Sequence, residues 1–143
     1  MNTVILRAAG PADSAAIAAL VTQLGYPVDP AAMAERLKQL CARPDYITLV
    51  AEVSGEVIGM VGAYLGYALE FDGPYGRLTG LVVDASWRGR GVGKLLMREI
   101  EVALKERGAS VVTLTSGKHR SEAHGFYKAI GYEETGLRFV KRL

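Results

Sequence analysis

The amino-acid sequence predicts an α/β fold in which a central mixed sheet carries helices on both faces. Apolar or β-branched runs alternate with amphipathic helical patterns along the 143 residues. Two such runs, 46–53 and 57–67, are separated by Ser54-Gly55-Glu56, a spacing typical of an antiparallel hairpin. A strand, a helix and a strand then follow one another between Leu78 and Leu114. This order predicts a parallel crossover, so the sheet should contain both kinds of pairing.

The first half of the chain reads as one strand, two helices and the hairpin. The apolar run 3–7 is the candidate first strand. A helix is predicted to begin near Pro11 and to end at Gly25, because apolar side chains recur at helical spacing between them. A second helix is predicted from the cap and proline pair Asp29-Pro30 to just before Pro44. The side chains expected to face inward are Ile17, Leu20, Val21 and Leu24 in the first helix, and Met33, Leu37, Leu40 and Cys41 in the second.

The second half of the chain continues the alternation of strands and helices. The strongest helical pattern lies over 91–107, where the apolar side chains share one face and Gly108 follows as a stop signal. Neither a repeat nor a linker interrupts the sequence, so the chain 1–143 reads as a single domain. The other predicted elements are a loop over 70–76, strands over 78–83 and 111–114, a helix from Ser121 to Ile130, and two last short strands over 132–134 and 137–141.

Net charge and composition limit which partners and which cellular compartment the sequence predicts. Seventeen Lys and Arg against fifteen Asp and Glu give a formal net charge of +2, too balanced to predict a nucleic-acid partner. Cys41 is the one cysteine, so no internal disulfide forms and a reducing compartment is expected. No signal peptide is visible at the start, and no window approaches the ~20 apolar residues of a membrane span. These observations predict a cytoplasmic protein without a membrane partner.

A glycine-rich, basic segment lies between the predicted strand 78–83 and the predicted helix 91–107. It reads Arg88-Gly89-Arg90-Gly91-Val92-Gly93-Lys94. Glycines let the backbone approach a ligand closely, and the free N–H groups of a helix start favour an anion. The segment therefore predicts a pyrophosphate-binding site, with a turn of solvated arginines as the alternative interpretation.

Two common nucleotide-binding motifs do not fit this segment. A Walker loop would need glycine where Arg88 stands and serine or threonine where Leu95 stands. A dinucleotide fingerprint would fit Gly89 and Gly91, but its third glycine position is Lys94. The pyrophosphate therefore belongs to another class of ligand.

Two motifs resemble those of the GNAT superfamily of N-acetyltransferases. Arg88 to Gly93 is similar to its Arg/Gln-x-x-Gly-x-Gly/Ala signature, and the preceding Leu81-Val82-Val83-Asp84 resembles its fourth strand. The segment 123–132, Ala-His-Gly-Phe-Tyr-Lys-Ala-Ile-Gly-Tyr, resembles the second motif, Ala-x-x-Phe-Tyr-x-x-x-Gly-Phe/Tyr. The order of elements and the length agree as well, so the resemblance covers the chain and implies a single-domain GNAT fold.

The resemblance implies acetyl-CoA as cosubstrate and an amine as acceptor. The backbone of Leu81, Val82 and Val83 would then hold the pantetheine arm, and Arg88 to Lys94 the pyrophosphate. Within the superfamily the chain looks most like small-molecule acetyltransferases such as the aminoalkylphosphonate N-acetyltransferases. The segments that carry this finer likeness are 23–27, 120–127 and 139–143.

Tyr127 is the candidate catalytic residue carried over from the second motif. The amine would attack the thioester directly in a ternary complex, and backbone N–H groups of 81–83 would stabilise the oxyanion. The departing thiolate then needs a proton, which a phenol can donate as general acid. His124 lies one helical turn away and is read as a surface residue, with proton transfer as its alternative role.

The chain departs from the family pattern at two places. Many relatives carry a carboxylate in the fourth strand as general base, but 77–81 reads Arg-Leu-Thr-Gly-Leu. Glu70, Asp72 or a water relay remain as candidate bases. Arg120 stands where many relatives have asparagine, so it would contact a coenzyme phosphate, bind an anionic group of the substrate or remain solvated.

The acceptor pocket is expected between the loops 25–29 and 68–76, as the fold resemblance implies. Tyr26, Tyr67, Phe71 and Tyr75 would make it partly aromatic. Two rival functions stay open: acetylation of a protein N-terminus or lysine, and a non-catalytic acyl-CoA-binding sensor. Dimers are common in the superfamily, so a homodimer is compatible with the sequence, and no cluster of metal ligands is expected.

Overall fold

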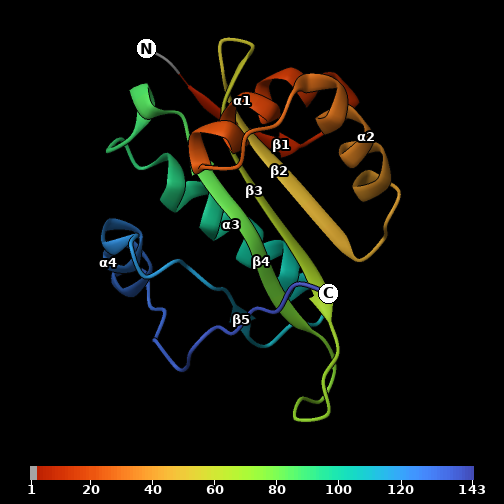
Figure 1. The fold of residues 1–143 in the computed structure, drawn as a ribbon, viewed down its shortest axis with the longest axis vertical. Helices are drawn as coiled ribbons and strands as arrows, with labels where there is room; N and C mark the ends of the chain where they lie inside the picture. Colours follow the sequence, from red (N-terminus) through yellow and green to blue (C-terminus); the bar gives the residue numbers. More distant parts are fainter. Residues whose placement is uncertain (1–2) are drawn as a thin grey trace. The chain divides into compact units, whose positions relative to one another are not determined.

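Residues 3–143 are described in a computed structural model (Figure 1), and their contacts divide them into two compact units. The first unit ends at Thr113, and the second is Leu114–Leu143. The first unit contains the whole sheet and three of the α-helices. The second contains the second sequence motif. No helix within 3–143 is both long enough and apolar enough to span a bilayer.

The sheet has five strands in the order in which they occur along the chain. Each strand from β1 to β3 pairs antiparallel with the next, whereas β4 and β5 are parallel. The helix α3 (Val92–Glu106) connects these two parallel strands. The predicted mixed sheet and its single crossover are therefore confirmed. The strands are β1 (Val4–Ala8), β2 (Tyr46–Val53), β3 (Glu56–Gly66), β4 (Tyr75–Val83) and β5 (Val112–Thr113).

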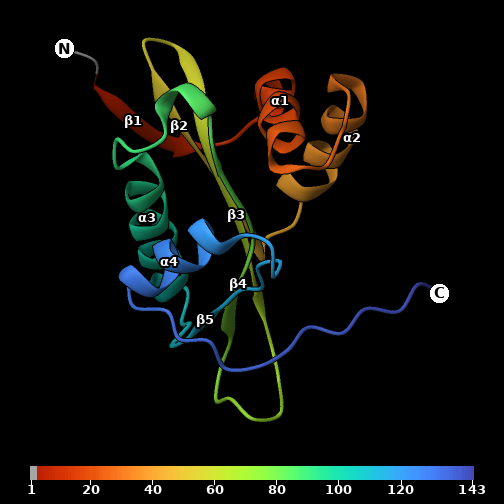
Figure 2. The same cartoon turned by 60° about the vertical axis from the view of Figure 1, so that its left-hand side comes forward.

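Helices lie on both faces of this sheet, as the sequence predicts (Figure 2). The helices α1 (Ser14–Leu24) and α2 (Pro30–Cys41) pack on one face and on each other. On the opposite face lies α3, because a Cβ added at Gly59 of β3 would come within 3.1 Å of Leu96. The predicted cap of α2 is confirmed, since Asp29 Oδ1 accepts a hydrogen bond from the amide of Ala32 at 2.7 Å.

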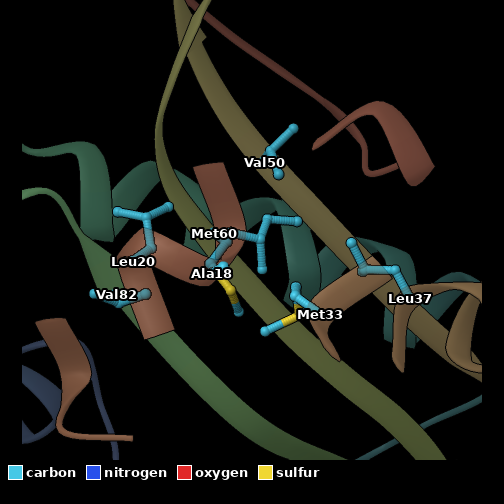
Figure 3. Packing of buried hydrophobic residues seen from close by; sticks show 8 residues of the cluster. Ala18, Leu20, Met33, Leu37, Val50, Met60 and Val82 are labelled. Atoms are coloured by element: carbon cyan, nitrogen blue, oxygen red, sulfur yellow. The ribbon is translucent and has the colours of Figure 1, made fainter. Parts of the chain in front are cut away.

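The core between α1, α2 and the sheet is apolar and closely packed (Figure 3). Alternate residues of a strand face opposite sides, so Met60 of β3 joins this core while its neighbours face α3. Short Ala18 lets the helix approach the sheet closely. The cluster consists of Ile17, Ala18, Leu20, Met33, Leu37, Val50, Met60 and Val82.

Four details of the sequence prediction are wrong. Cys41 is exposed rather than inward, because it is the last residue of α2 and its thiol points toward the Ala9 carbonyl at 3.9 Å. The strand β4 begins at Tyr75, inside the predicted loop, because 75–77 pair with β3 and 76–77 also with β5. The strand β5 has only two residues. The two last strands do not form.

The two predicted C-terminal strands fall in a segment without regular secondary structure. Leu137 and Phe139 have the alternating pattern of a strand, but they are 70% and 87% exposed. A strand needs a paired edge, and α4 (Ser121–Ala129) is the regular element among residues 114–143. The alternating pattern of apolar residues therefore predicted two strands that the sheet does not contain.

A partly buried ion network ties β1 to the start of α1. Arg7 Nη2 lies 2.8 Å from Asp13 Oδ1, and Arg7 Nε lies 2.7 Å from Glu52 Oε2. The Asp13 side chain is only 8% exposed and also accepts the amide of Gly10 at 2.8 Å. The hydrogen bonds from Arg7 hold the pKa of Asp13 below its usual value, with burial opposing them.

Asp13→Asn is expected to destabilise the protein by about 2 kcal/mol, less than a fully buried pair because Arg7 is partly exposed. Because the folded pKa is lowered, the stabilisation is present above the unfolded pKa of ~3.9 and is lost as the pH falls through the lowered value. Urea unfolding at neutral and acid pH measures both effects. Asp45→Asn, at an exposed pair 3.7 Å from Arg43, is the matched control and should change little. Equal losses in the two variants would contradict the account.

Candidate functional site

One edge of β4 is open near its C-terminal end. Along its length β4 pairs with β3, but on the other edge only Gly76 and Arg77 pair with β5 within the first unit. The amide of Asp84 donates to Ile58 of β3 at 2.8 Å. In the same trans peptide the Val83 carbonyl points the opposite way, toward the open edge. Strand alternation gives Leu81 the same orientation, with both its N–H and its C=O at that edge.

This geometry separates the three residues that the sequence places on the pantetheine arm. Leu81 and Val83 present their backbones to the open edge, whereas Val82 presents its backbone to β3 and its side chain to the core. The Val83 carbonyl also accepts a hydrogen bond from Arg88 Nε at 3.1 Å. Leu81 is therefore the residue whose donor and acceptor are best placed for a ligand lying along this edge.

The glycine-rich segment forms a turn that exposes the start of α3. Gly89 and Gly91 have φ of +77° and +82°, a conformation that favours glycine. Gly91 is the N-cap of α3, and the first bond within the helix runs from Leu95 N to Gly91 O at 3.1 Å. The amides of the three residues between them precede that first bond. Exposed amides at a helix start, together with the helix dipole, are suited to bind an anion.

Side chains of the segment divide into structural and exposed ones. Val92, the first residue of α3, is buried between the helix and β3. Its methyl group would lie 3.5 Å from a Cβ at Gly59, so only its backbone can face a ligand. The guanidinium of Arg90 lies 4.7 Å from the centre of the Trp87 ring, a cation–π contact that orients it. Lys94 is exposed on the first turn of α3. Arg88 is held by the Val83 carbonyl, so its head group stays at the open edge.

Sequence reasoning did not identify the role of Gln23 at the end of α1. Its amide nitrogen donates to Asp84 Oδ1 at 2.8 Å, and its oxygen accepts the amide of Ala85 at 3.0 Å. Asp84 also accepts the amide of Ser86, and the bonds from Ser86 and Gln23 lower the pKa of Asp84. Gln23 thus fixes the segment between β4 and the glycine-rich turn.

Coenzyme affinity is expected to fall as ionic strength rises, because exposed charges such as Arg90 and Lys94 are screened over ~10 Å at 0.1 M salt. Calorimetric titration of acetyl-CoA at low and high salt measures the slope. Arg90→Gln should flatten it, since that change removes one charge and leaves the backbone amides. An affinity that does not change with salt would assign recognition to the backbone alone.

The second unit places Tyr127 in a small aromatic cluster on α4. Its ring makes edge contacts with Phe126 at 5.3 Å and Tyr132 at 5.8 Å between centres. Burial raises the pKa of Tyr127, and the positive charge of Arg120 acts in the opposite direction. A phenol in this state stays protonated at neutral pH and can donate a proton.

His124 has a structural contact in the same unit. Its Nε2 lies 2.8 Å from the Gly117 carbonyl, so this nitrogen carries the proton and anchors the loop before α4. This favours the structural interpretation of His124. Phe126 is half-buried beside Tyr127.

Three of the four aromatic residues expected to wall the acceptor pocket are exposed, and Tyr75 is half-buried. Tyr26 and Tyr67 are 59% and 77% exposed, and Phe71 packs against Tyr75 with ring centres 5.7 Å apart. Glu70 and Asp72 lie in the exposed loop between β3 and β4. No group of three metal-ligating side chains occurs in the part of the chain that the structure describes.

Sequence reasoning also missed a pair of hydroxyl groups on β2 and β4. Tyr46 OH and Thr79 Oγ1 are 2.6 Å apart, although 33 residues separate them in the chain. Thr79 lies in the stretch of β4 that lacks a carboxylate. Only the strand register brings the two together, so no local pattern could have identified them.

The family model described as the Acetyltransferase (GNAT) family matches residues 15–132. The aminoglycoside N(6')-acetyltransferase type 1 of Stenotrophomonas maltophilia is 31% identical over 134 residues, covering 91% of this chain and 86% of that protein. The aminoalkylphosphonate N-acetyltransferase of Salmonella typhimurium is 32% identical over 90 residues, which cover 63% of this chain and 58% of that protein.

Solved structures agree in fold. A GNAT family acetyltransferase from Staphylococcus aureus superposes with a TM-score of 0.84 at 26% identity, covering all of both chains. The aminoglycoside N-acetyltransferase AAC(6')-Iy in complex with CoA superposes with a TM-score of 0.87 at 22% identity, covering 100% of this chain and 96% of that one. The predicted fold class is confirmed, and so is the prediction of an acyltransferase that uses acetyl-CoA. The chain belongs to the acetyltransferase (GNAT) family.

Proposed function

We propose that the protein transfers the acetyl group of acetyl-CoA to the primary amine of a small molecule by direct attack in a ternary complex. The observation that carries the proposal is the open edge of β4, which is followed, after residues 84–87, by the glycine turn and the exposed start of α3. A strand edge with free backbone groups suits an amide-containing arm, and a helix start suits its pyrophosphate.

In this proposal different groups of the chain bind the pyrophosphate, stabilise the oxyanion and transfer protons. The amides at the start of α3, with Arg88, Arg90 and Lys94, hold the pyrophosphate. The Leu81 N–H donates to the oxyanion that develops on the thioester carbonyl. Tyr127 donates the proton that the departing thiolate takes up. The amine loses its own proton to water or to a carboxylate of the 68–76 loop, Glu70 or Asp72.

Relatives support the small-molecule class of acceptor. Two of them are an aminoalkylphosphonate N-acetyltransferase and an aminoglycoside N(6')-acetyltransferase. We extend this class to the present chain, and we propose a cytoplasmic location because the coenzyme is a metabolite of that compartment. A homodimer remains part of the proposal. Arg120, near Tyr127 on the second unit, is proposed to contact an anionic group of the coenzyme or the acceptor.

The proposal is tested by measuring free thiol release from acetyl-CoA with a panel of amines. Tyramine, neamine and 2-aminoethylphosphonate sample aromatic, polycationic and zwitterionic acceptors, and peptides with a free N-terminus or lysine test the protein-directed alternative. We expect saturable turnover with at least one small amine and slower turnover with every peptide. Faster turnover with a peptide, or coenzyme binding without any turnover, would replace the proposal by one of the two rivals.

A further inference from the structure

The face of the sheet that carries α1 and α2 extends beyond these helices along β3 and β4 (Figure 2). Met60 faces α1 and α2, so Gly62 and Tyr64, two and four residues further along β3, lie on the same face. Tyr46 pairs with Tyr64 across β2 and β3, and their rings stack 6.4 Å apart. This part of the sheet therefore presents polar aromatic side chains instead of a buried core.

The hydroxyl pair Tyr46–Thr79 lies across this face at Gly62. A Cβ at Gly62 would stand 2.9 Å from Thr79 Oγ1 and 3.0 Å from Tyr46 OH, closer than side chains approach. Only glycine at this position leaves room for both hydroxyls to meet above β3. Thr79 is also the extra residue of a β-bulge, since Gly62 pairs with Gly80 but Ala63 pairs with Leu78. Bulges redirect a side chain locally, and they are common beside active sites.

The pair has unused hydrogen-bonding capacity. Each hydroxyl offers one hydrogen and two acceptor lone pairs, and their mutual bond uses one hydrogen and one lone pair. Thr79 is exposed and Tyr46 is half-buried, so an amine can reach the remaining lone pairs. The stretch 77–81 holds no acid, so the hydroxyl pair supplies polar acceptors on this face where the strand itself offers no carboxylate.

The position of the pair along β4 relates it to the acyl group. The phosphate-binding turn follows β4, and Val83 and then Leu81 face the open edge as one moves back along the strand. A coenzyme arm that runs from the turn along this edge leads toward Thr79, two residues before Leu81. The acceptor amine must approach the thioester from beside this point.

We propose that the hydroxyl pair of Tyr46 and Thr79 binds the acceptor amine and orients it for attack, and this inference rests on the proposed function. The amine N–H groups donate to Tyr46 OH and Thr79 Oγ1, which leaves the nitrogen lone pair free for the carbonyl carbon. A neutral pair holds the amine without the ion pair that a strand carboxylate would form. The pair therefore stabilises the charged, non-nucleophilic form of the amine less than a strand carboxylate would.

The test compares variants that remove one hydroxyl at a time, with the amine that the wild type turns over fastest in the panel above. Tyr46→Phe keeps the ring stacked on Tyr64, and Thr79→Val keeps the branched shape. Each should lower kcat/KM for the amine about tenfold, as expected for loss of a hydrogen bond to a polar group, and leave KM for acetyl-CoA unchanged. The double variant should lose little more than either single one, because either change breaks the pair.

Two further variants separate binding from structure. Thr79→Ser retains the hydroxyl and should recover most of the activity that Thr79→Val loses. Tyr64→Phe removes a neighbouring phenol that is not part of the pair, so kcat/KM for the amine should stay at the wild-type value. Wild-type kinetics in both Tyr46→Phe and Thr79→Val would overturn the inference and leave the proposed function standing. An equal loss toward acetyl-CoA and amine would assign the pair to folding and also overturn it. Absence of wild-type turnover with every amine would overturn the proposed function and this inference together.

Discussion

Gly91→Asp is expected to abolish the binding of acetyl-CoA. Gly91 is the N-cap of α3 with φ of +82°, beside the amides that precede the first bond of the helix. A carboxylate at this point would accept those amides itself and repel the pyrophosphate. Isothermal titration calorimetry should detect no binding to the variant, and its Tm should not rise with ligand, whereas the Tm of the wild type should rise.

Gly91→Asn is the matched control for this change. Asparagine has nearly the shape of aspartate and tolerates the same left-handed backbone, but it has no charge. It should weaken binding much less than aspartate does, because its side chain can accept an amide at the helix start but does not repel the pyrophosphate. Equal losses in the two variants would mean that backbone strain, rather than charge, controls the site. An unchanged affinity of Gly91→Asp would show that the pyrophosphate binds elsewhere.

Tyr127→Phe is expected to lower kcat by about 10² to 10⁴, the usual contribution of general acid catalysis. The substitution keeps the ring that contacts Phe126 and Tyr132, so folding and KM for acetyl-CoA should be preserved. A thiolate is a tolerable leaving group, which favours the lower end of the range. Steady-state thiol release under conditions where chemistry limits the rate measures the effect. A near wild-type kcat would leave Tyr127 as a packing residue.

The pH dependence of kcat provides a second test of the role of Tyr127. Burial raises the pKa of Tyr127, so its proton is retained up to the ordinary tyrosine value of ~10 and beyond. The kcat profile should therefore show no alkaline decline between neutral pH and that value. Arg120→Ala removes the charge that opposes the shift and should move any alkaline limb to still higher pH. A decline near pH 8 that Tyr127→Phe abolishes would contradict the assignment of this proton.

Local patterns were sufficient for most of the fold, because each helix has its own period and punctuation. Pro30 and Asp29 set the start of α2, and Gly25 in the left-handed region ends α1. The prediction failed where structure depends on distant partners. Phe139 alternates like a strand residue but is exposed and outside any strand, and Cys41 lies at a helix end where periodicity no longer indicates burial.

The candidate site shows the same division between local and non-local information. The turn around Gly89 and Gly91 is a local motif, and the helix after it begins where the sequence predicts. In contrast, the bond between Gln23 and Asp84 and the pair Tyr46–Thr79 join residues that are 61 and 33 positions apart. No spacing rule connects such residues. They meet only because the sheet register and the packing of α1 bring them together.

The most direct test of the central claim follows a labelled acetyl group. Acetyl-CoA with isotopic label in its acetyl carbons is incubated with the protein and the best amine, and mass spectrometry compares N-acetylated amine with free coenzyme A. We expect one labelled acetyl-amine for each thiol released, with Gly91→Asp forming neither product. Thiol release without acetylated amine, or acetylation that persists in Gly91→Asp, would contradict transfer from a coenzyme held at the start of α3.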